Sequence, residues 1–282
     1  MVKEPEGEAS LEDQVRFEIR DGVAWITINR PDRGNSITPA CRDRIRDLVR
    51  GLNGGFDARA VVLTASGHRH FCTGADISES RVYPDRPADA PPPGRVVGEP
   101  RRMMLEGQLQ LIPALLDSEL PIIAAVNGTA AGVGVHIALA CDLVLMADTA
   151  KLIEIFARRG LVPDALGTWM LPRLVGPHKA KELFFFADDV PADEAMRLGL
   201  CNRVVAAAEL AGVAGEWAGR LASGPSKTHM LSKWLVNQSF DSDRQTMAEY
   251  EAWAVEANSR TNDAGEGVAS FRERREPEWR GW

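Results

Sequence analysis

Residues 122–147, IIAAVNGTAAGVGVHIALACDLVLMA, decide the fold of this chain. They read as an apolar strand, an Asn-Gly turn, a glycine-bearing loop, a short apolar helix and a second apolar strand. The stretch is long enough to cross a bilayer, but Asn127, His136 and Asp142 are costly in lipid and three glycines interrupt it. Strands that are apolar on both faces are typical of a covered sheet, so the stretch predicts an α/β fold rather than a membrane span.

The residues before this stretch continue the alternation of strands and helices. VRFEI and VAWITI flank Asp21-Gly22, a dipeptide that is typical of two-residue hairpin turns. Thr38 followed by Pro39 indicates the start of a helix that runs to about Leu52. VVLTA at 61–65 predicts a further buried strand.

Two more segments lead into the deciding stretch. Residues 80–100 contain six prolines, which excludes a core element and predicts a loop. A helix is expected from about Arg101 to Asp117.

The chain divides into three parts by composition. Residues 1–14 read as a mobile acidic tail, 15–205 as the α/β core and 206–282 as a helical region, with helices expected at 207–222, 225–238, 242–260 and 263–275. The helical region is rich in tryptophan, with Trp217, Trp234, Trp253 and Trp279. Surplus aromatic side chains on an appendage indicate an oligomer interface, with core packing as the simpler alternative.

Composition bounds the function. The 282 residues are 45% hydrophobic and 26% charged, with a net charge of -7. That usage is typical of a globular protein, and the acidic balance argues against general binding of nucleic acid or of an anionic membrane. Four scattered cysteines without metal-like spacing, and a start without an apolar signal segment, predict reduced thiols in a cytoplasmic protein. We expect no bound metal and no nicotinamide cofactor.

Two glycine-bearing loops each follow an apolar strand. Residues 71–77 read FCTGADI and residues 126–136 read VNGTAAGVGVH. Glycine allows positive φ and close approach of the backbone, so two such loops at strand ends can aim two N–H groups at one oxygen. Such a pair forms an oxyanion hole, which stabilises charge that develops on a carbonyl.

These segments carry a family resemblance. FCTGADI, PIIAAVNGTAAGVGVHIALACDLVLMAD and RRGLVPDALGTWMLPRLVG, in this order, resemble the enoyl-CoA hydratase/isomerase (crotonase) family over roughly residues 15–275. The resemblance implies a crotonase-like spiral of β-β-α turns with a C-terminal helical trimerisation region. It also implies a trimer or a dimer of trimers, and an acyl-CoA thioester as substrate, with coenzyme A as part of that substrate.

The resemblance assigns the oxyanion hole to the backbone N–H groups of Ala75 and Val133, which would stabilise a thioester enolate. Family members usually carry glycine where Val133 stands. A backbone donor does not depend on its side chain, although the isopropyl group can narrow the site. The loop residues Ala75, Asp76 and Ile77 are expected to bind coenzyme A.

The chain departs from the family at the two glutamates that handle water in hydratases, since His136 and Phe156 stand there. Phe156 cannot transfer a proton. His136 can, because an imidazole titrates near neutral pH, or it can be a packed histidine bonded to a carbonyl. Glu154 is expected to reach the pocket only if the local chain leaves the family path.

Asp164, in GLVPDALGTW, stands where isomerases and dehalogenases of the family carry a catalytic aspartate. A single carboxylate in an apolar pocket suits proton shuttling, because burial raises its pKa. Phe156 and Trp169 are expected to line that pocket. The alternative for Asp164 is the N-cap of the next helix.

Coenzyme A carries phosphates, so cationic side chains are expected near its entry. Arg30 and Arg33 match a family region near the nucleotide, and the C-terminal arginines, Arg280 among them, are a second group. The alternative for all of them is solvated surface charge.

These observations favour an acyl-CoA isomerase with Asp164 as acid and base. The alternatives are an enoyl-CoA hydratase that uses His136, and a non-catalytic acyl-CoA-binding protein that has lost both hydratase glutamates. The orientation of Asp164 separates the enzyme from the binding protein.

Overall fold

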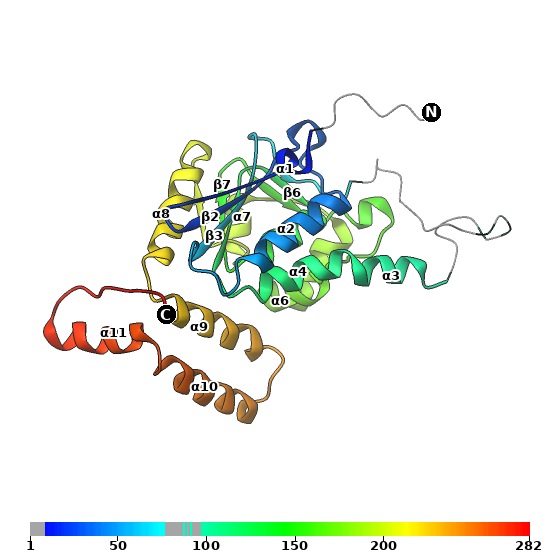
Figure 1. Cartoon of the computed structure of the whole chain (residues 1–282). Coiled ribbons are helices and arrows are strands. Elements are labelled where there is room, and N and C mark those ends of the chain that lie inside the picture. Colours follow the sequence, from blue (N-terminus) through cyan, green and yellow to red (C-terminus); the bar gives the residue numbers. More distant parts are fainter. Residues whose placement is uncertain (1–8, 77–86, 88, 90, 92–96) are drawn as a thin grey trace.

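The computed structural model describes residues 9–76, 87, 89, 91 and 97–282. Ile77 and most of the proline-rich stretch at 80–100 lie outside the described residues. The predicted acidic tail ends in a helical turn, α1 (Leu11–Gln14), whose N-cap Ser10 accepts a hydrogen bond from the backbone of Asp13. Figure 1 shows the described part as a body of sheets and helices with a separate group of helices at its C-terminal end.

The larger sheet has six strands in the order β1-β2-β3-β5-β7-β10. The strands are β1 (Val15–Arg20), β2 (Val23–Ile28), β3 (Ala60–Ala65), β5 (Ile122–Val126), β7 (Leu143–Ala147) and β10 (Arg203–Val205). Only β1 and β2 pair antiparallel within this sheet, through the predicted Asp21-Gly22 hairpin, whose φ angles are 51° and 73°. The rest of the sheet is parallel, and β5 is buried along its whole length, as its apolar sequence predicts.

The smaller sheet has four strands of three residues each, in the order β4-β6-β8-β9. They are β4 (His70–Cys72), β6 (Thr129–Ala131), β8 (Lys151–Ile153) and β9 (Asp189–Pro191). The first three run parallel and β9 pairs antiparallel with β8. Residues 122–147 therefore contribute to both sheets, since β5 and β7 lie in the larger one and β6 in the smaller one.

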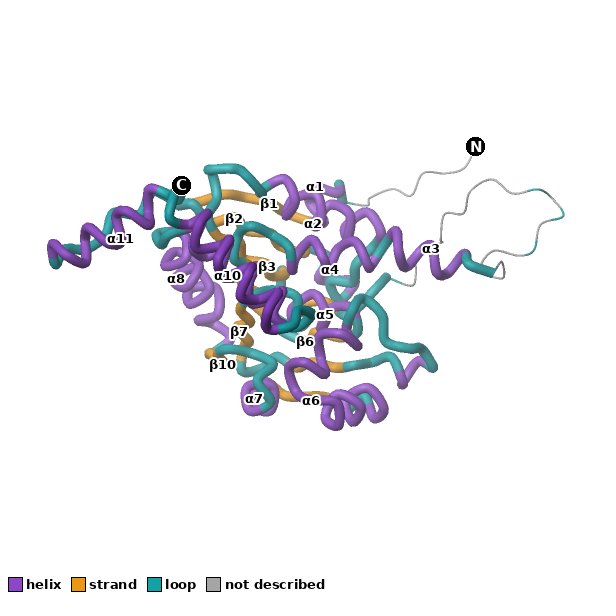
Figure 2. The backbone as a smooth tube through the Cα atoms, turned by 90° about the horizontal axis from the view of Figure 1, so that it is seen from below, coloured by secondary structure: helices purple, strands orange, loops and turns teal. Residues whose placement is uncertain are grey.

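Helices cover the sheets on both sides. In Figure 2, α2 (Pro39–Gly51) and α4 (Gln108–Leu116) lie on one side of the body, with α3 (Glu99–Glu106) projecting outward from α4, and α6 (Gly167–Phe186) and α7 (Ala192–Arg197) lie on the other side. The short helix α5 (Val133–Leu139) is buried between them. Thr38 caps α2 by accepting from the backbone of Cys41, as predicted.

The single helix expected from Arg101 to Asp117 is wrong in one respect, because it is two helices that break at Gly107. This glycine has φ -111° and ψ -105°. A methyl carbon on it would lie 2.5 Å from the carbonyl oxygen of Met103 and 2.6 Å from Nη1 of Arg42. A side chain would clash at that position, so the chain turns there on a glycine.

The C-terminal region has two different parts. α8 (Leu210–Ala222) packs on β2, β3, β5 and β7 and buries its small apolar side chains in the core. α9 (Ser226–Ser239), α10 (Arg244–Asn258) and α11 (Asn262–Glu273) extend away from the body, in orange to red in Figure 1. We call these three helices the C-terminal arm. Among the described residues no helix is long and apolar enough to cross a membrane.

Candidate active site

Three parallel strands of the smaller sheet end at one edge and bring three loops together. Cys72 of β4 is paired with Ala130 of β6, and Ala130 is paired with Leu152 of β8. Ala75 comes three residues after Cys72, and Val133 comes three residues after its partner Ala130. The register therefore places the two predicted oxyanion donors side by side.

The contacts between the two loops support this placement. A methyl carbon on Gly74 would lie 3.4 Å from the carbonyl oxygen of Ala131, and one on Gly134 would lie 2.1 Å from the carbonyl oxygen of Cys72. Only glycine fits at position 134, so that α5 can start directly against β4. Within the described part of the chain, neither Ala75 nor Val133 donates its backbone N–H to an acceptor. Two free N–H groups on adjacent loops have the form of an oxyanion hole.

The side chain of Val133 packs into the hydrophobic core, since the residue is 3% exposed. Its isopropyl group therefore lies away from open solvent, while its backbone N–H carries no partner.

A histidine and a glutamate meet beside these loops. His136 of α5 is fully buried, and its Nε2 lies 3.2 Å and 3.1 Å from the two carboxylate oxygens of Glu154. The ring of Phe156 stacks on the imidazole with a centroid separation of 5.5 Å and an interplanar angle of 13°. A methyl carbon on Gly167 would lie only 2.0 Å from Nε2 of the same ring. The imidazole is thus held on its face, at its edge and at one nitrogen.

Asp164 completes the cluster from the loop before α6. Burial raises the pKa of its carboxyl above the ordinary value, the charge on His136 opposes part of that rise, and Glu154 adds to it. Oδ1 of Asp164 and Nδ1 of His136 are both buried without a hydrogen-bond partner among the described residues. Unpartnered buried polar atoms are rare, and each one needs an explanation.

Asp164 does not cap α6. The N-cap of that helix is Leu166, and no side chain caps it. Ala165 and Leu166 both have left-handed backbone angles, with φ of 48° and 57°. Such angles are strained for residues with a side chain, by about 1–2 kcal/mol each, and strain of this kind clusters at functional sites. The alternative of Asp164 as an N-cap is therefore wrong.

Comparison with known proteins agrees with this arrangement. The family model described as enoyl-CoA hydratase/isomerase matches residues 18–281. The chain belongs to the enoyl-CoA hydratase/isomerase family. This match, and the likeness to solved structures, confirm the predicted crotonase fold.

Relatives of known name include both chemistries. A crotonyl-CoA hydratase of Syntrophomonas wolfei is 34% identical, covering 93% of this chain and 96% of its own. A 1,2-epoxyphenylacetyl-CoA isomerase of Escherichia coli is 33% identical, covering 93% and 97%. The crystal structure of an enoyl-CoA hydratase from Bacillus anthracis is 29% identical, with a TM-score of 0.85 over 95% of this chain and 100% of that one. Family membership thus fixes an acyl-CoA enzyme without choosing between hydration and isomerisation.

Glu154 is the member of the cluster to which the sequence analysis gave no role of its own. We expected it to reach the pocket only if the chain departed from the family path, and yet it is buried against His136. The position of Glu154 in the cluster follows from the pairing of strands β6 and β8. Glu154 directly follows β8, which lies next to β6, so it comes to the same edge as Val133.

The two residues predicted to line the acyl pocket have different settings. Phe156 is buried and stacks on His136, so it closes the inner end of the cluster. Trp169 is half-buried on the first turn of α6, and the guanidinium of Arg173 covers its ring at 4.3 Å. Phe156 is thus placed directly against His136 of the cluster.

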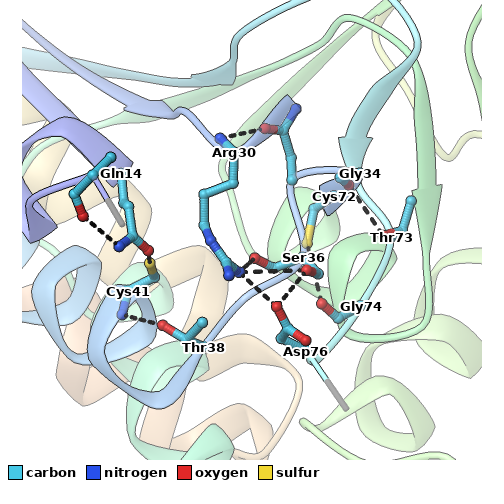
Figure 3. A network of polar contacts seen from close by, with 12 residues as sticks. Gln14, Arg30, Gly34, Ser36, Thr38, Cys41, Cys72, Thr73, Gly74 and Asp76 are labelled. Carbon is cyan, nitrogen blue, oxygen red and sulfur yellow. Dashed lines mark hydrogen bonds and ion pairs between the residues drawn. The ribbon is translucent and has the colours of Figure 1, made fainter. Parts of the chain in front are cut away.

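Two of the residues predicted to bind coenzyme A, Arg30 and Asp76, pair with each other. Figure 3 shows Arg30 turned toward Ser36 and Asp76. Nη1 of Arg30 lies 2.9 Å from Oδ2 of Asp76 and donates to the carbonyl oxygen of Ser36 at 2.7 Å. The side chains of Arg30 and Asp76 are 9% and 6% exposed. This burial does not fit the prediction that Arg30 meets a phosphate, and its contacts instead hold the loop that carries Ala75.

The remaining cations differ from Arg30. Arg33 is exposed beside the same loop. Arg280 is exposed at the end of the chain, where its backbone N–H donates to Asp263 at 2.7 Å. Among the described residues no group of histidine, cysteine, aspartate and glutamate side chains has the arrangement of a metal site.

Proposed function

We propose that the enzyme moves a double bond in an acyl-CoA thioester, with Asp164 as the acid and base. The observation that carries this proposal is the setting of Asp164. It is only partly buried, whereas His136 is 0% and Glu154 5% exposed, and one of its carboxylate oxygens is unpartnered. Of the three ionisable side chains, Asp164 is the one that a substrate reaches first.

The proposed reaction needs no water. The N–H groups of Ala75 and Val133 hold the thioester oxygen. This stabilises the enolate and so makes it easier to remove a proton from a C–H group conjugated with the thioester carbonyl. The carboxylate of Asp164 takes a proton from one carbon, and the electron pair of that C–H bond moves into a conjugated enolate on the held oxygen. The protonated Asp164 then returns the proton to a different carbon, and the double bond has moved. A raised carboxyl pKa suits both halves of this cycle near neutral pH.

Hydration is the second candidate, because His136 and Glu154 form a paired imidazole and carboxylate of the kind that activates a nucleophile. Phe156 argues against it, since an aromatic ring stands where the family's second glutamate handles water. The complete burial of His136 argues against direct contact with a water nucleophile.

The test follows both reactions on the same protein. Spectrophotometric assays with 3-enoyl-CoA and 2-enoyl-CoA separate isomerisation from hydration. We expect isomerisation, with a loss of about 10²–10⁴-fold in kcat for Asp164→Asn, the usual contribution of one acid-base group. Binding of the acyl-CoA, measured by calorimetry, should persist in that variant. The exposed Asp188→Asn serves as the matched control.

Each other outcome has a meaning. Full isomerase activity in Asp164→Asn contradicts the assigned role. Hydration that disappears in His136→Gln favours the second candidate. Binding of acyl-CoA without turnover of either substrate favours a non-catalytic binding protein.

We also propose that the chain acts in the cytoplasm as a homo-oligomer, a trimer or a dimer of trimers. Large apolar side chains are exposed on α6, α10 and α11: Phe185 (69%), Phe186 (67%), Trp253 (68%) and Phe271 (85%). A groove of about 720 Å³ lies between the helices of the arm and Trp279. Apolar surface on this scale is typical of an interface, and sedimentation velocity measures the expected mass.

A further inference from the structure

We propose that Glu154 is a positioning residue whose buried carboxylate pairs with Nε2 of His136, holds the ring in place and favours the charged imidazole as the neighbour of Asp164. This inference rests on the proposed role of Asp164 and adds the support behind it. Glu154 would then act on the reaction through His136 rather than by contact with the substrate.

The first step is the contact itself. Nε2 of His136 lies 3.2 Å from Oε1 and 3.1 Å from Oε2 of Glu154, so one N–H is shared between two oxygens. An ionised carboxylate only accepts hydrogen bonds, so this contact favours the form of the ring in which Nε2 carries the proton. Both side chains are nine-tenths or more buried, which strengthens the interaction.

The second step is the fixed orientation of the ring. Phe156 stacks on the face of the ring. The edge of the ring fits against Gly167 because that residue has no side chain, and a methyl group there would overlap the ring. The backbone N–H of Gly167 also donates to the carbonyl oxygen of Asp164 at 3.0 Å. One glycine thus sets the position of the imidazole and of the loop that carries Asp164.

The third step concerns the two atoms that remain. Nδ1 of His136 and Oδ1 of Asp164 are buried without partners among the described residues. His136 is near enough for its positive charge to lower the pKa of Asp164, against the larger effect of burial. With Nε2 paired to Glu154, Nδ1 is the ring nitrogen that has no partner among the described residues. The charge that Asp164 experiences then depends on Glu154.

Other ionisable groups around α5 do not replace this arrangement. In their described residues, α4, β5 and β6 carry none, and β4 carries His70 and Cys72. Burial raises the pKa of Cys72 to about 12, so that thiol stays neutral. The pKa of His70 is lowered, mainly by burial. The ionisable side chains of α6 stand beyond its first turn and are exposed or half-buried: Arg173, His178, Lys179, Lys181 and Glu182.

The decisive experiment measures the titration of the Asp164 carboxyl by carbon NMR in substrate-free protein, with Asp164→Asn to assign the signal. The variant Glu154→Gln removes a negative charge, and that alone lowers the pKa of Asp164, because Glu154 raises it. If Glu154 maintains the charge on His136, the variant also removes the larger opposing effect of His136, and the pKa of Asp164 rises. We expect a rise of about half a unit or more. A fall, or no change, overturns the proposal.

Further variants and nitrogen NMR check this titration result. Glu154→Asp keeps the charge and should restore most of the wild-type titration. His136→Gln should raise the pKa of Asp164 as well, and the double variant should match Glu154→Gln, since His136 has then already lost its effect in the single variant. Nitrogen NMR of the imidazole should lose the Nε2–H signature in Glu154→Gln. If Glu154→Gln does not fold, His136→Gln and Glu154→Asp still give the sign of the effect.

Kinetics separates this proposal from the one it rests on. In Glu154→Gln, kcat should fall with little change in KM, and its acidic limb should move to higher pH. The control Glu182→Gln, on the exposed face of α6, should behave as wild type. Should Asp164→Asn keep its isomerase activity, the proposed function fails, whereas the NMR titration still decides the role of Glu154.

Discussion

Two buried polar pairs in this molecule have similar geometry but differ in how many of their hydrogen-bonding atoms find partners. At the site, His136 meets Glu154 at 3.1 Å. Where the C-terminal arm meets the body, Lys233 of α9 meets Asp142 at 2.8 Å, and the lysine side chain is 8% exposed. We call the second pair the arm anchor.

The arm anchor is complete. Lys233 has three donors and finds three acceptors, namely Asp142 and the carbonyl oxygens of Leu115 and Leu120. Asp142 also accepts from the backbone N–H of Ile122 at 2.7 Å. In the part of the chain that the structure describes, the site pair instead leaves one ring nitrogen of His136 without a partner, and the neighbouring Asp164 has one unpartnered oxygen. A pair that holds structure is saturated, and a pair that serves chemistry keeps atoms free for the reaction.

Among changes that keep every ionisable side chain, the largest effect is expected from Gly167→Ala, which disturbs the pair of His136 and Glu154. The new methyl group would lie 2.0 Å from Nε2 of His136, so the ring or the start of α6 must move. A displacement of about 1 Å at a reacting group can reduce the rate about 100-fold, and we expect a loss of that order in kcat.

Gly219→Ala is the matched control for that change. Gly219 lies within α8, and nothing stands within 4 Å of the added methyl carbon. Activity should be unchanged, and the melting temperature should hold or rise slightly. Equal activity in both alanine variants would remove Gly167 from the site.

Lys233→Met removes the cation of the arm anchor and should lower the free energy of unfolding by roughly 2 kcal/mol. Breaking a fully buried pair costs about 3–5 kcal/mol, and the effect is smaller here because the side chain of Asp142 keeps 23% of its exposure. Burial already raises the pKa of Asp142, and Lys233 opposes that rise. In the variant the loss should therefore be greatest at neutral pH and shrink below the ordinary carboxyl range.

Urea unfolding at pH 4 and pH 7 measures this prediction. Lys179→Met, which breaks an exposed pair with Glu182, is the control. A loss that does not depend on pH would mean that Asp142 does not feel the charge of Lys233.

The same contrast explains what could be predicted from the sequence. The hairpin at Asp21-Gly22, the start of α2 and the strands of residues 122–147 follow from turn chemistry, capping and apolar runs, and the structure confirms them. These are local signals, each readable within a few residues. The break at Gly107 was missed because an isolated glycine inside a helical pattern is often tolerated and does not by itself mark a helix end.

At the site, local pattern and strand register contribute differently. The resemblance pointed to Asp164 and His136, and the structure brings both into one cluster. Glu154 and the pairing of Arg30 with Asp76 depend on which strands and loops become neighbours. A side chain whose role is set by a partner far along the chain carries no local signal, so it has to be read from the fold.

Asp164→Asn is expected to stabilise the protein while it removes activity, by on the order of 1 kcal/mol at neutral pH, the usual size of such exchanges at functional sites. The sign follows from its raised pKa. A carboxyl that is harder to ionise in the folded state contributes stability below its ordinary pKa of 3.8 and loses it as pH rises through the folded value. Asparagine never ionises, so the gain should be present at pH 7 and vanish toward pH 3.

Thermal unfolding across that pH range measures the difference between Asp164→Asn and wild type. A gain of equal size at every pH would assign the effect to packing rather than to charge. A loss at neutral pH would mean that the carboxylate of Asp164 is stabilised in the folded protein, as Asp142 is by Lys233.

The smallest effect is expected where a pair is neither buried nor saturated. Arg260 and Glu256 of the C-terminal arm approach one another one helical turn apart, with side chains 77% and 53% exposed. Water and salt screen such a pair, and holding two long side chains together opposes the attraction. Arg260→Ala should change the melting temperature by about 1 °C or less and leave kcat unaltered. A larger shift would show that this face of the arm is covered in the assembled protein, because only burial makes a pair of this geometry matter.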